Sequence, residues 1–307
     1  MTEDTRPPTL TIGLPNFGSW FRSPGDLVEA AAELDRVGVD RISVVDHLVM
    51  GRNTDAYAWG TFPTGPKAPW YEPLTMLTAV AAVTSRIRLS TAILVAPVRP
   101  AAVLAKTVAT LDALSGGRVD LGVGTGWQRE EFDALGLDFD RRGRLLDEVL
   151  GGCRALWEET PARFISESTS FDDIWCVPGP VQDRLPVWFA GTLGARNLRR
   201  IVELGDGWIP IMGATFDDVR RDAERLRGAW DAAGRQGEPA VTVRLPPVRS
   251  GDALDVDATV AQVPAAVAAG ATDVSIAAQS LASPGDTGTL VRRATELLAG
   301  IRGGVDR

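Results

Sequence analysis

Residues 87–126 read IRLSTAILVAPVRPAAVLAKTVATLDALSGGRVDLGVGTG, and this stretch decides the fold. The β-branched run over 87–95 predicts a strand, and the apolar spacing over 100–114 predicts a helix. A break at Ser115-Gly116-Gly117 ends the helix, and a second strand is predicted over 118–123. A strand, a helix and a strand in this order predict parallel strands joined by a helical crossover.

The same alternation continues on both sides of this unit. Further strands are predicted over 9–14, 41–45, 187–190, 208–211, 240–245 and 273–277. Further helices are predicted over 24–37, 73–85, 128–135 with 141–158, 193–204, 217–233, 258–269 and 287–302. Gly38 is suited to end the first helix, and Thr215 to cap the helix over 217–233.

Eight evenly spread βα units predict an α/β fold of the (β/α)8 or TIM-barrel type, in one domain over residues 1–307. Two segments without a lasting period are interpreted as insertions: 48–72 after strand two, and 160–184 before strand five, where a short hairpin is expected. The alternative is an open doubly wound sheet, which the same alternation would also produce. The first strand, however, ends in Pro15-Asn16-Phe17-Gly18 and not in a GxGxxG turn, which favours the barrel.

Composition is that of an ordinary globular protein, with 45% hydrophobic and 23% charged residues. No apolar run approaches the roughly 20 residues that span a bilayer. The segment from Met1 to Pro8 lacks the basic start and apolar stretch of a secretory signal, so a cytoplasmic location is expected. The formal net charge of -8 argues against nucleic acid or an anionic membrane surface as a partner. Cys153 and Cys176 have no CxxC spacing, which indicates neither a disulfide scaffold nor a zinc site.

Barrel enzymes place their catalytic groups just after the C-terminal ends of the strands. His47 is the only histidine in the chain, and it follows strand two directly behind Asp46. An imidazole can give or take a proton near neutral pH, and an adjacent carboxylate can orient it. His47 and Asp46 are therefore the candidate catalytic residues. The alternative is that His47 is only a structural hydrogen-bonding group.

The same inventory excludes two kinds of barrel chemistry. Metal-dependent hydrolase barrels need several histidine ligands, so no metal site is expected. A Schiff-base barrel needs a lysine at a strand end, whereas Lys67 and Lys106, the only lysines, lie in an irregular loop and inside a predicted helix. A bound organic cofactor must therefore supply the chemistry.

Two turns of small residues follow predicted strands: Gly124-Thr125-Gly126, and Ala190-Gly191-Thr192-Leu193-Gly194. Such turns let backbone N–H groups approach a phosphate or a flat ring, with a helix N-terminus supplying partial positive charge. A tight βα turn also needs glycine for steric reasons alone, and that alternative stays open.

Several motifs lie at or near these strand ends. They are WYEPLTML at 70–77, TSRIRLST at 84–91, LAK at 104–106, LDALSGGR at 111–118, LGVGTGW at 121–127 and GDGW at 205–208. Together they resemble the luciferase-like monooxygenase superfamily, and within it the coenzyme F420-dependent branch. The likeness covers about residues 9–300 and is most specific between Glu72 and Trp127.

The resemblance implies a cofactor site, residue by residue. Asp46 and His47 would contact the cofactor ring, and the histidine is implicated in catalysis in the dehydrogenases of this family. A non-proline cis peptide would form a bulge behind the ring at Ala92-Ile93. The remaining contacts would come from the two turns: Thr125, Gly126 and Trp127 beside the ring, and Ala190, Gly191, Thr192 and Gly194 around the phosphate.

One departure from the family matters. Its sugar-phosphate dehydrogenases carry a glutamate acid/base directly after the Gly-Thr-Gly turn, where this chain has Trp127. Glu130 or Glu131, one helical turn later, is an alternative source of that carboxylate, but a sugar-phosphate substrate is not expected. The anionic tail of F420 also requires a local arginine patch, because the chain as a whole is acidic.

The resemblance implies an F420-dependent oxidoreductase that transfers hydride between C5 of the deazaflavin and a small organic substrate, with His47 as proton donor or acceptor. The alternatives are an FMN-dependent monooxygenase working with a separate reductase, and a non-catalytic flavin-binding protein. A second copy of the chain, in a homodimer, is one option for a protein partner. Aromatic residues are interpreted as the roof of an apolar substrate pocket, with core packing as the alternative for two of them, Trp70 and Tyr71. These roof residues are Phe17, Trp20, Tyr57, Trp59, Phe62, Trp70 and Tyr71.

Overall fold

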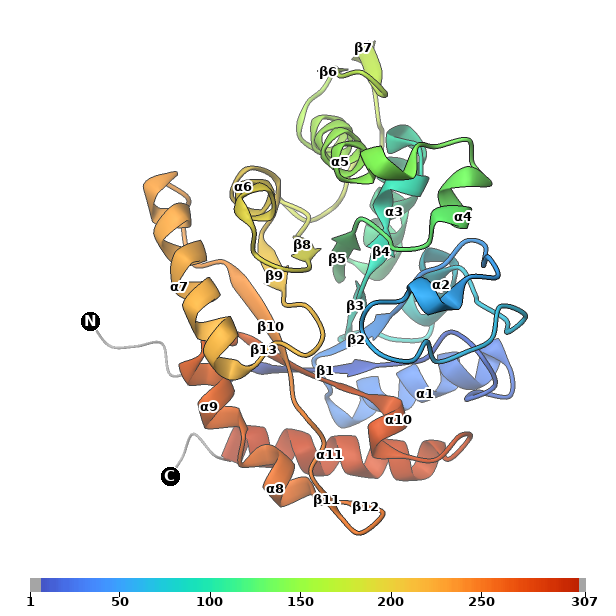
Figure 1. The fold of residues 1–307 in the computed structure, drawn as a ribbon, viewed down its shortest axis with the longest axis vertical. Helices are drawn as coiled ribbons and strands as arrows, with labels where there is room; N and C mark the ends of the chain where they lie inside the picture. Colours follow the sequence, from blue (N-terminus) through green and yellow to red (C-terminus); the bar gives the residue numbers. More distant parts are fainter. Residues whose placement is uncertain (1–6, 304–307) are drawn as a thin grey trace.

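The computed structural model describes residues 7–303 and forms a closed barrel of parallel strands surrounded by helices (Figure 1). The barrel strands are β1 (Thr9–Gly13), β2 (Arg41–Val44), β3 (Arg88–Thr91) with β4 (Leu94–Val95), β5 (Val119–Gly124), β8 (Val187–Ala190), β9 (Gly207–Ile209), β10 (Ala240–Arg244) and β13 (Asp273–Ala277). Each pairs in parallel with its neighbours, and pairing of β3 with β5 closes the ring. The predicted barrel is therefore confirmed, and the open sheet is excluded.

The third barrel strand is split into β3 and β4 at Ala92-Ile93. The peptide bond between these two residues is cis, as the family resemblance implied. Gly122 lies beside this break, where a Cβ atom would be 1.9 Å from the carbonyl oxygen of Thr91. Any side chain at position 122 would collide with backbone, so the chain can take this path only past a glycine.

The helices are α1 (Pro24–Val37), α2 (Pro73–Ala81), α3 (Ala101–Ser115), α4 (Arg129–Asp133), α5 (Arg142–Glu158), α6 (Ala195–Leu204), α7 (Phe216–Ala232), α8 (Val256–Val260), α9 (Val263–Ala268), α10 (Ala278–Leu281) and α11 (Thr287–Gly303). Thr215 caps α7 as predicted, in a reciprocal capping box with Asp218. The prediction of one helix over 258–269 is wrong, because the structure has two helices there, α8 and α9. Pro264 lies at the start of α9, and because proline lacks an N–H it cannot continue the hydrogen bonding of α8.

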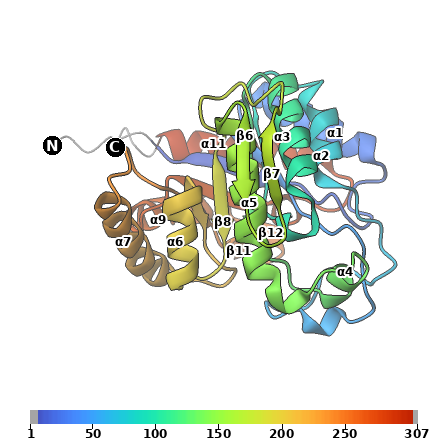
Figure 2. The same ribbon diagram turned by 90° about the horizontal axis from the view of Figure 1, so that it is seen from above.

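The two insertions differ in structure. Segment 160–184 contains the expected hairpin, formed by β6 (Ala162–Ile165) and β7 (Ser170–Ile174). Segment 48–72 has one short 3-10 helix, Thr54–Ala56, and otherwise irregular backbone. Both views place this segment beside α4 (Figure 1, Figure 2). A second small hairpin, β11 (Arg249–Ser250) with β12 (Ala253–Leu254), was not predicted.

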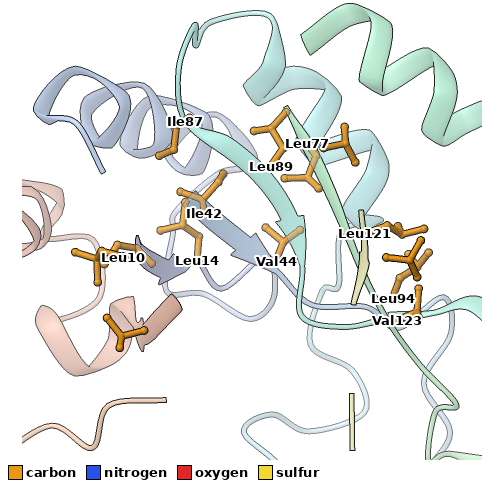
Figure 3. Packing of buried hydrophobic residues seen from close by; sticks show 14 of the residues in the cluster. Leu10, Leu14, Ile42, Val44, Leu77, Ile87, Leu89, Leu94, Leu121 and Val123 are labelled. Atoms are coloured by element: carbon orange, nitrogen blue, oxygen red, sulfur yellow. The ribbon is translucent and has the colours of Figure 1, made fainter. Parts of the chain in front are cut away.

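Apolar side chains from neighbouring strands fill the space between the barrel and its helices (Figure 3). Leu10, Ile42, Leu89 and Leu121 come from four strands, and each is at most 1% exposed. At the N-terminal end of the barrel, buried ion pairs take the place of apolar packing. Arg41 donates to Asp120 at 2.8 Å and to Asp273 at 2.5 Å. These opposite charges compensate one another within the protein. The C-terminal end of the barrel is therefore the end left for function.

No helix within residues 7–303 combines the length and the apolar character needed to cross a membrane. Residues 1–6 of the segment from Met1 to Pro8, on which the expectation of a cytoplasmic location depends, lie outside the described residues. Residues 304–307 of the predicted domain also lie outside them.

Candidate functional site

The residues proposed for the cofactor follow the C-terminal ends of adjacent strands. Register pairs Val44 with Thr91, Val95 with Gly124, and Val123 with Phe189. The turns after β2, β4, β5 and β8 therefore open at the same end of the barrel. The last residues of β2, β4 and β5 are buried, as are Asp46 and His47 beyond β2, but the other proposed ligand residues are accessible. Ala92, Ile93, Thr125, Gly126, Trp127, Ala190 and Gly191 are half-buried, and Thr192 and Gly194 are exposed.

His47 is held by a carboxylate that sequence reasoning did not assign to it. The Nδ1 atom of His47 lies 3.2 Å from Oε2 of Glu131, which is fully buried. The other oxygen of Glu131 accepts the backbone N–H of Leu48 at 2.6 Å. When Glu131 is ionised, its carboxylate accepts but does not donate, so that Nδ1 carries the proton and Nε2 is the nitrogen left for a ligand.

The prediction that Asp46 orients His47 is wrong. Both carboxylate oxygens of Asp46 accept from the guanidinium of Arg99, at 2.6 and 3.0 Å, and one also accepts the Val95 N–H at 2.8 Å. Arg99 donates in addition to Glu72 at 3.0 Å, and Glu72 caps α2 by accepting the Thr75 N–H. Asp46 therefore ties the end of β2 to the segment after β4 and to the start of α2.

Burial and pairing act in opposite directions in this cluster. Burial raises the pKa of Asp46 above its ordinary value, while the hydrogen bonds and charge of Arg99 act to lower it. Burial also acts to raise the pKa of Glu72, but the Thr75 hydrogen bonds and the charge of Arg99 outweigh burial, so this pKa is lowered. A buried charge that loses its partner is costly, so these three groups depend on one another.

Aromatic side chains gather around His47. The ring centroid of His47 lies 4.8 Å from that of Trp70, 5.5 Å from Trp127 and 5.7 Å from Phe62, with each pair edge to face. Phe17 stacks on the outer face of Trp70 at 4.5 Å. Trp70 is half-buried within this aromatic group beside His47, which supports its interpretation as a roof residue over core packing. Of the other predicted roof residues, Trp59 touches only Tyr57 within this group, and Trp20 packs on Phe21 instead.

Asn16 fixes the floor beneath these rings. Its side-chain nitrogen donates to the carbonyl oxygens of Val45 and Tyr71, both at 2.7 Å, and its oxygen accepts the Val45 N–H at 3.0 Å. One buried amide thereby joins the ends of β1 and β2 to the residue after Trp70. Hydrogen bonds of this kind hold a site in one geometry before any ligand arrives.

The two small-residue turns have different reasons for their glycines. Gly126 has a φ of 75°, and a Cβ there would lie 2.7 Å from Val95, so packing alone requires glycine. A Cβ at Gly194 would meet no atom within 4 Å, so that side of the second turn is open. Asn197 shapes the second turn by donating to the carbonyls of Ala190 and Thr192. Gly194 is the N-cap of α6 and offers no side-chain acceptor to the first N–H groups of that helix.

The structure also places a pair of arginines that sequence reasoning could not. Arg142 begins α5 and Arg196 lies in the first turn of α6. The Arg196 side chain reaches the start of α5, since a Cβ on Gly143 would lie 3.3 Å from its Nη1. Arg142 packs over the Phe139 ring at 4.0 Å and donates to a backbone carbonyl. Within residues 7–303, neither arginine forms an ion pair with a carboxylate, and Arg196, two residues after Gly194, keeps its positive charge beside the second turn.

Sequence reasoning therefore found the histidine, the strand ends and the turns, but missed the groups that hold them. Those groups are Arg99, Glu72, Gln128 and the role of Glu131. Gln128 is fully buried and accepts the Gly51 N–H at 2.9 Å, so it fixes segment 48–72 near its start. One signal was available: Arg99 is a lone charge that closes an apolar run from 92 to 98 directly after a strand.

Comparison with known proteins gives one family and several related folds. A family model described as luciferase-like monooxygenase matches residues 7–296. An uncharacterized protein of Mycobacterium tuberculosis is 39% identical over 170 residues, which are 55% of this chain and 60% of that protein. The matched region thus spans less than two thirds of this relative.

Two solved structures share the fold along nearly the whole chain. An F420-dependent secondary alcohol dehydrogenase, in complex with an F420-acetone adduct, superposes with a TM-score of 0.75 at 16% identity and covers 97% of this chain and 100% of its own. The oxygenating constituent of 3,6-diketocamphane monooxygenase of Pseudomonas putida, in complex with FMN, gives a TM-score of 0.71 at 14% identity, covering 97% and 99%. At these identities the likeness establishes the fold alone.

Proposed function

This chain belongs to the luciferase-like monooxygenase family of oxidoreductases, and on that premise we propose that it binds coenzyme F420 and exchanges hydride with a small carbonyl or alcohol substrate. One observation carries the proposal: the single histidine is buried at the mouth of the barrel with its Nδ1 held by Glu131, beside accessible turns of small residues.

The residues at the mouth fit a flat ring bearing a phosphorylated chain. Ala92, and Thr125 and Gly126 directly after β5, offer a half-buried surface with little side-chain bulk, and Ile93 and Trp127 border it. Around Gly194 a Cβ would meet no atom within 4 Å, and the first N–H groups of α6 point out of this turn. A phosphate is stabilised at such a helix N-terminus. When bound, the coenzyme supplies or accepts the hydride.

The role of His47 follows from its hydrogen bonds. With the Nδ1 proton directed at Glu131, Nε2 takes a proton from an alcohol oxygen as hydride leaves the carbon that bears it, or gives one to a carbonyl oxygen in the reverse direction. Glu131 compensates the positive charge that appears on the ring when Nε2 is protonated. Glu131 also keeps the imidazole ring of His47 in one orientation, because the second oxygen of Glu131 is held by the N–H of Leu48.

The free charge of Arg196 favours F420 over FMN. F420 carries an extended chain of glutamyl carboxylates beyond its phosphate, and FMN has no such tail. Arg196, two residues after Gly194, places a positive charge without an ion-pair partner among residues 7–303 next to the turn proposed for the phosphate, in a chain of net charge -8. A tail of carboxylates provides the counter-charge that Arg196 lacks within the described residues.

Equilibrium dialysis of the purified protein against F420 and FMN tests this proposal. We expect F420 to bind at least about tenfold more tightly than FMN, and we expect Arg196→Ala to weaken F420 with little effect on FMN. Tighter binding of FMN would support the monooxygenase alternative instead. If F420 binds and is never reduced or oxidised with any alcohol or ketone, and His47→Ala leaves its binding unchanged, the non-catalytic alternative holds.

A further inference from the structure

Phe62 is surrounded by aromatic rings although it belongs to an irregular segment. Its ring centroid lies 5.1 Å from Trp127, 5.3 Å from Tyr57, and 5.7 Å from both Trp70 and His47. Phe62 and Trp70 are nearly parallel, with 13° between their planes. We call His47, Tyr57, Trp70 and Trp127 the aromatic box. Phe62 fills the box, as a flat ring would.

Three walls of the box are held without help from Phe62. His47 is fixed by Glu131, and Trp127 directly follows the turn after β5. Trp70 is braced by Phe17, through both ring stacking and a backbone bridge. Phe62 itself lies between residues 57 and 69, where the structure has no helix or strand. Displacing Phe62 therefore costs few backbone contacts, and the box persists when Phe62 leaves.

The box also contains a hydrogen-bond donor without an acceptor. Nε1 of Trp70 is buried and has no partner within residues 7–303. A buried N–H without an acceptor costs free energy, and the indole N–H can only donate. The phenyl ring of Phe62 offers it no oxygen. A ring in the place of Phe62 lies over the face of Trp70, and a carbonyl group extending from that ring to the edge of the indole would satisfy this in-plane donor.

We propose that the aromatic box is the substrate site, that Phe62 occupies it in the absence of substrate, and that the substrate is a planar, largely aromatic carbonyl compound or the corresponding alcohol. This inference rests on the function proposed above and names the substrate class for it. The box disfavours polar sugars, because every wall carries an aromatic ring and Nε1 of Trp70 is the one buried side-chain donor without a partner among the described wall residues.

The position of the box favours the substrate over the ring of the coenzyme. The accessible small-residue turns proposed for the coenzyme follow β4, β5 and β8. Trp70, one wall of the box, and Phe17 after β1 that braces it are not among the residues proposed for the coenzyme, whereas His47 and Trp127 belong to both sets. His47 therefore lies between the two areas, where a proton-transferring group must be to reach the substrate.

Two ligands that differ in one atom test the proposal. 2-Acetylnaphthalene has a carbonyl oxygen where 2-isopropenylnaphthalene has a methylene group, and the two have nearly the same shape. Binding of each is measured by equilibrium dialysis, with the protein free of coenzyme and again with saturating F420. Because the coenzyme-free arm needs neither F420 nor turnover, it remains informative even if the proposed function fails.

Replacing Phe62 by a smaller residue should open the aromatic box to ligand. We expect Phe62→Ala to bind 2-acetylnaphthalene about tenfold more tightly than the unsubstituted protein, since a site that is mostly self-occupied loses apparent affinity in proportion. Phe62→Leu, which keeps apolar bulk, should give a smaller gain, and it replaces Phe62→Ala if that variant does not fold. Trp175→Ala is the control, because Trp175 is 59% exposed and makes no aromatic ring contact with the box among the described residues.

Removing the donor should abolish the preference for the ketone. We expect the unsubstituted protein to prefer 2-acetylnaphthalene over 2-isopropenylnaphthalene by about fivefold to tenfold, and Trp70→Phe to bind the two equally. The proposal is overturned if Phe62→Ala leaves ketone affinity unchanged, or if the ketone preference survives in Trp70→Phe. Tighter binding of F420, and not of the ketone, by Phe62→Ala would assign the box to the coenzyme and overturn the substrate assignment.

Discussion

Nδ1 of His47 lies 3.2 Å from Oε2 of Glu131, and the two side chains are 6% and 0% exposed. They come from different strand ends, since His47 follows β2 and Glu131 lies in α4 beyond β5. The same carboxylate holds the N–H of Leu48, the residue at which segment 48–72 begins. The geometry of the proton-transferring group and the path of the segment over it are thus fixed by one buried side chain.

Glu131→Gln should reverse the tautomer of His47. The amide oxygen can still accept from Leu48, which turns the amide NH2 group toward Nδ1 and forces that nitrogen to accept. We expect the proton to move to Nε2 and the rate of hydride exchange to fall about 100-fold, with little change in KM. Spectra of protein labelled with ¹⁵N-histidine report the tautomer directly, because the chain has 1 histidine. Glu130→Gln is the control and should leave both readouts unchanged.

Arg99→Ala should destabilise the protein strongly. Arg99 is 9% exposed and is the partner of buried Asp46, so its removal leaves an uncompensated carboxylate. We expect a loss of about 3–5 kcal/mol in the free energy of unfolding, measured by urea denaturation. Arg129→Ala removes an ion pair whose arginine side chain is 52% exposed, and should cost less than about 1 kcal/mol. Similar losses in both variants would contradict the buried network described here.

Two glycines should respond in opposite directions to alanine. At Gly122 the new Cβ would lie 1.9 Å from Thr91 O, so we expect a loss of about 3 kcal/mol or more, or failure to fold. At Gly228, inside α7, a Cβ would meet no atom within 4 Å. Gly228→Ala should therefore stabilise the protein by about 0.5–1 kcal/mol, because alanine loses less backbone entropy in a helix. Thermal and urea denaturation measure both changes.

Asp35 should stabilise the folded protein at neutral pH, and this contribution should be lost in acid. It accepts the N–H groups of Ser85, Arg86 and Ile87 just before β3. Burial acts to raise the pKa of Asp35, but the hydrogen bonds from Ile87, Ser85 and Arg86 outweigh it, so the pKa is lowered from 3.8. A lowered folded-state pKa means that the contribution is complete above the unfolded pKa and is lost as pH falls through the folded value.

Asp35→Asn should accordingly cost about 2 kcal/mol near pH 7. We expect the difference in unfolding free energy between the two proteins to stay constant down to about pH 5 and to shrink below about pH 4. Urea denaturation at several pH values measures it. A difference that grows on acidification would have the wrong sign and would refute the role given to these hydrogen bonds.

The barrel was readable from the sequence because periodicity reports local structure. β8 and β13 begin and end where predicted, and the cis peptide at Ala92-Ile93 follows from the family resemblance. The helix predicted over 258–269 failed because its apolar spacing continues through Pro264, and the missing N–H of proline prevailed over the pattern.

The site was only partly readable, for a physical reason. His47 and the turns are recognised by their positions relative to strands, which sequence order preserves. Glu131 and Arg99 act across 84 and 53 residues of chain respectively, and no local pattern specifies which carboxylate meets which cation. Asp46 was the nearer carboxylate in sequence, but its oxygens accept from Arg99 while Glu131 reaches His47.

The most direct test of the proposed function follows the one imidazole while coenzyme is added. Protein labelled with ¹⁵N-histidine is titrated first with F420 and then, in a separate sample, with FMN. We predict that F420 shifts the Nε2 resonance at stoichiometric concentration, that Nδ1 remains protonated, and that FMN has little effect at the same concentration. Saturating F420 that leaves both nitrogen resonances of His47 unchanged would contradict the proposal.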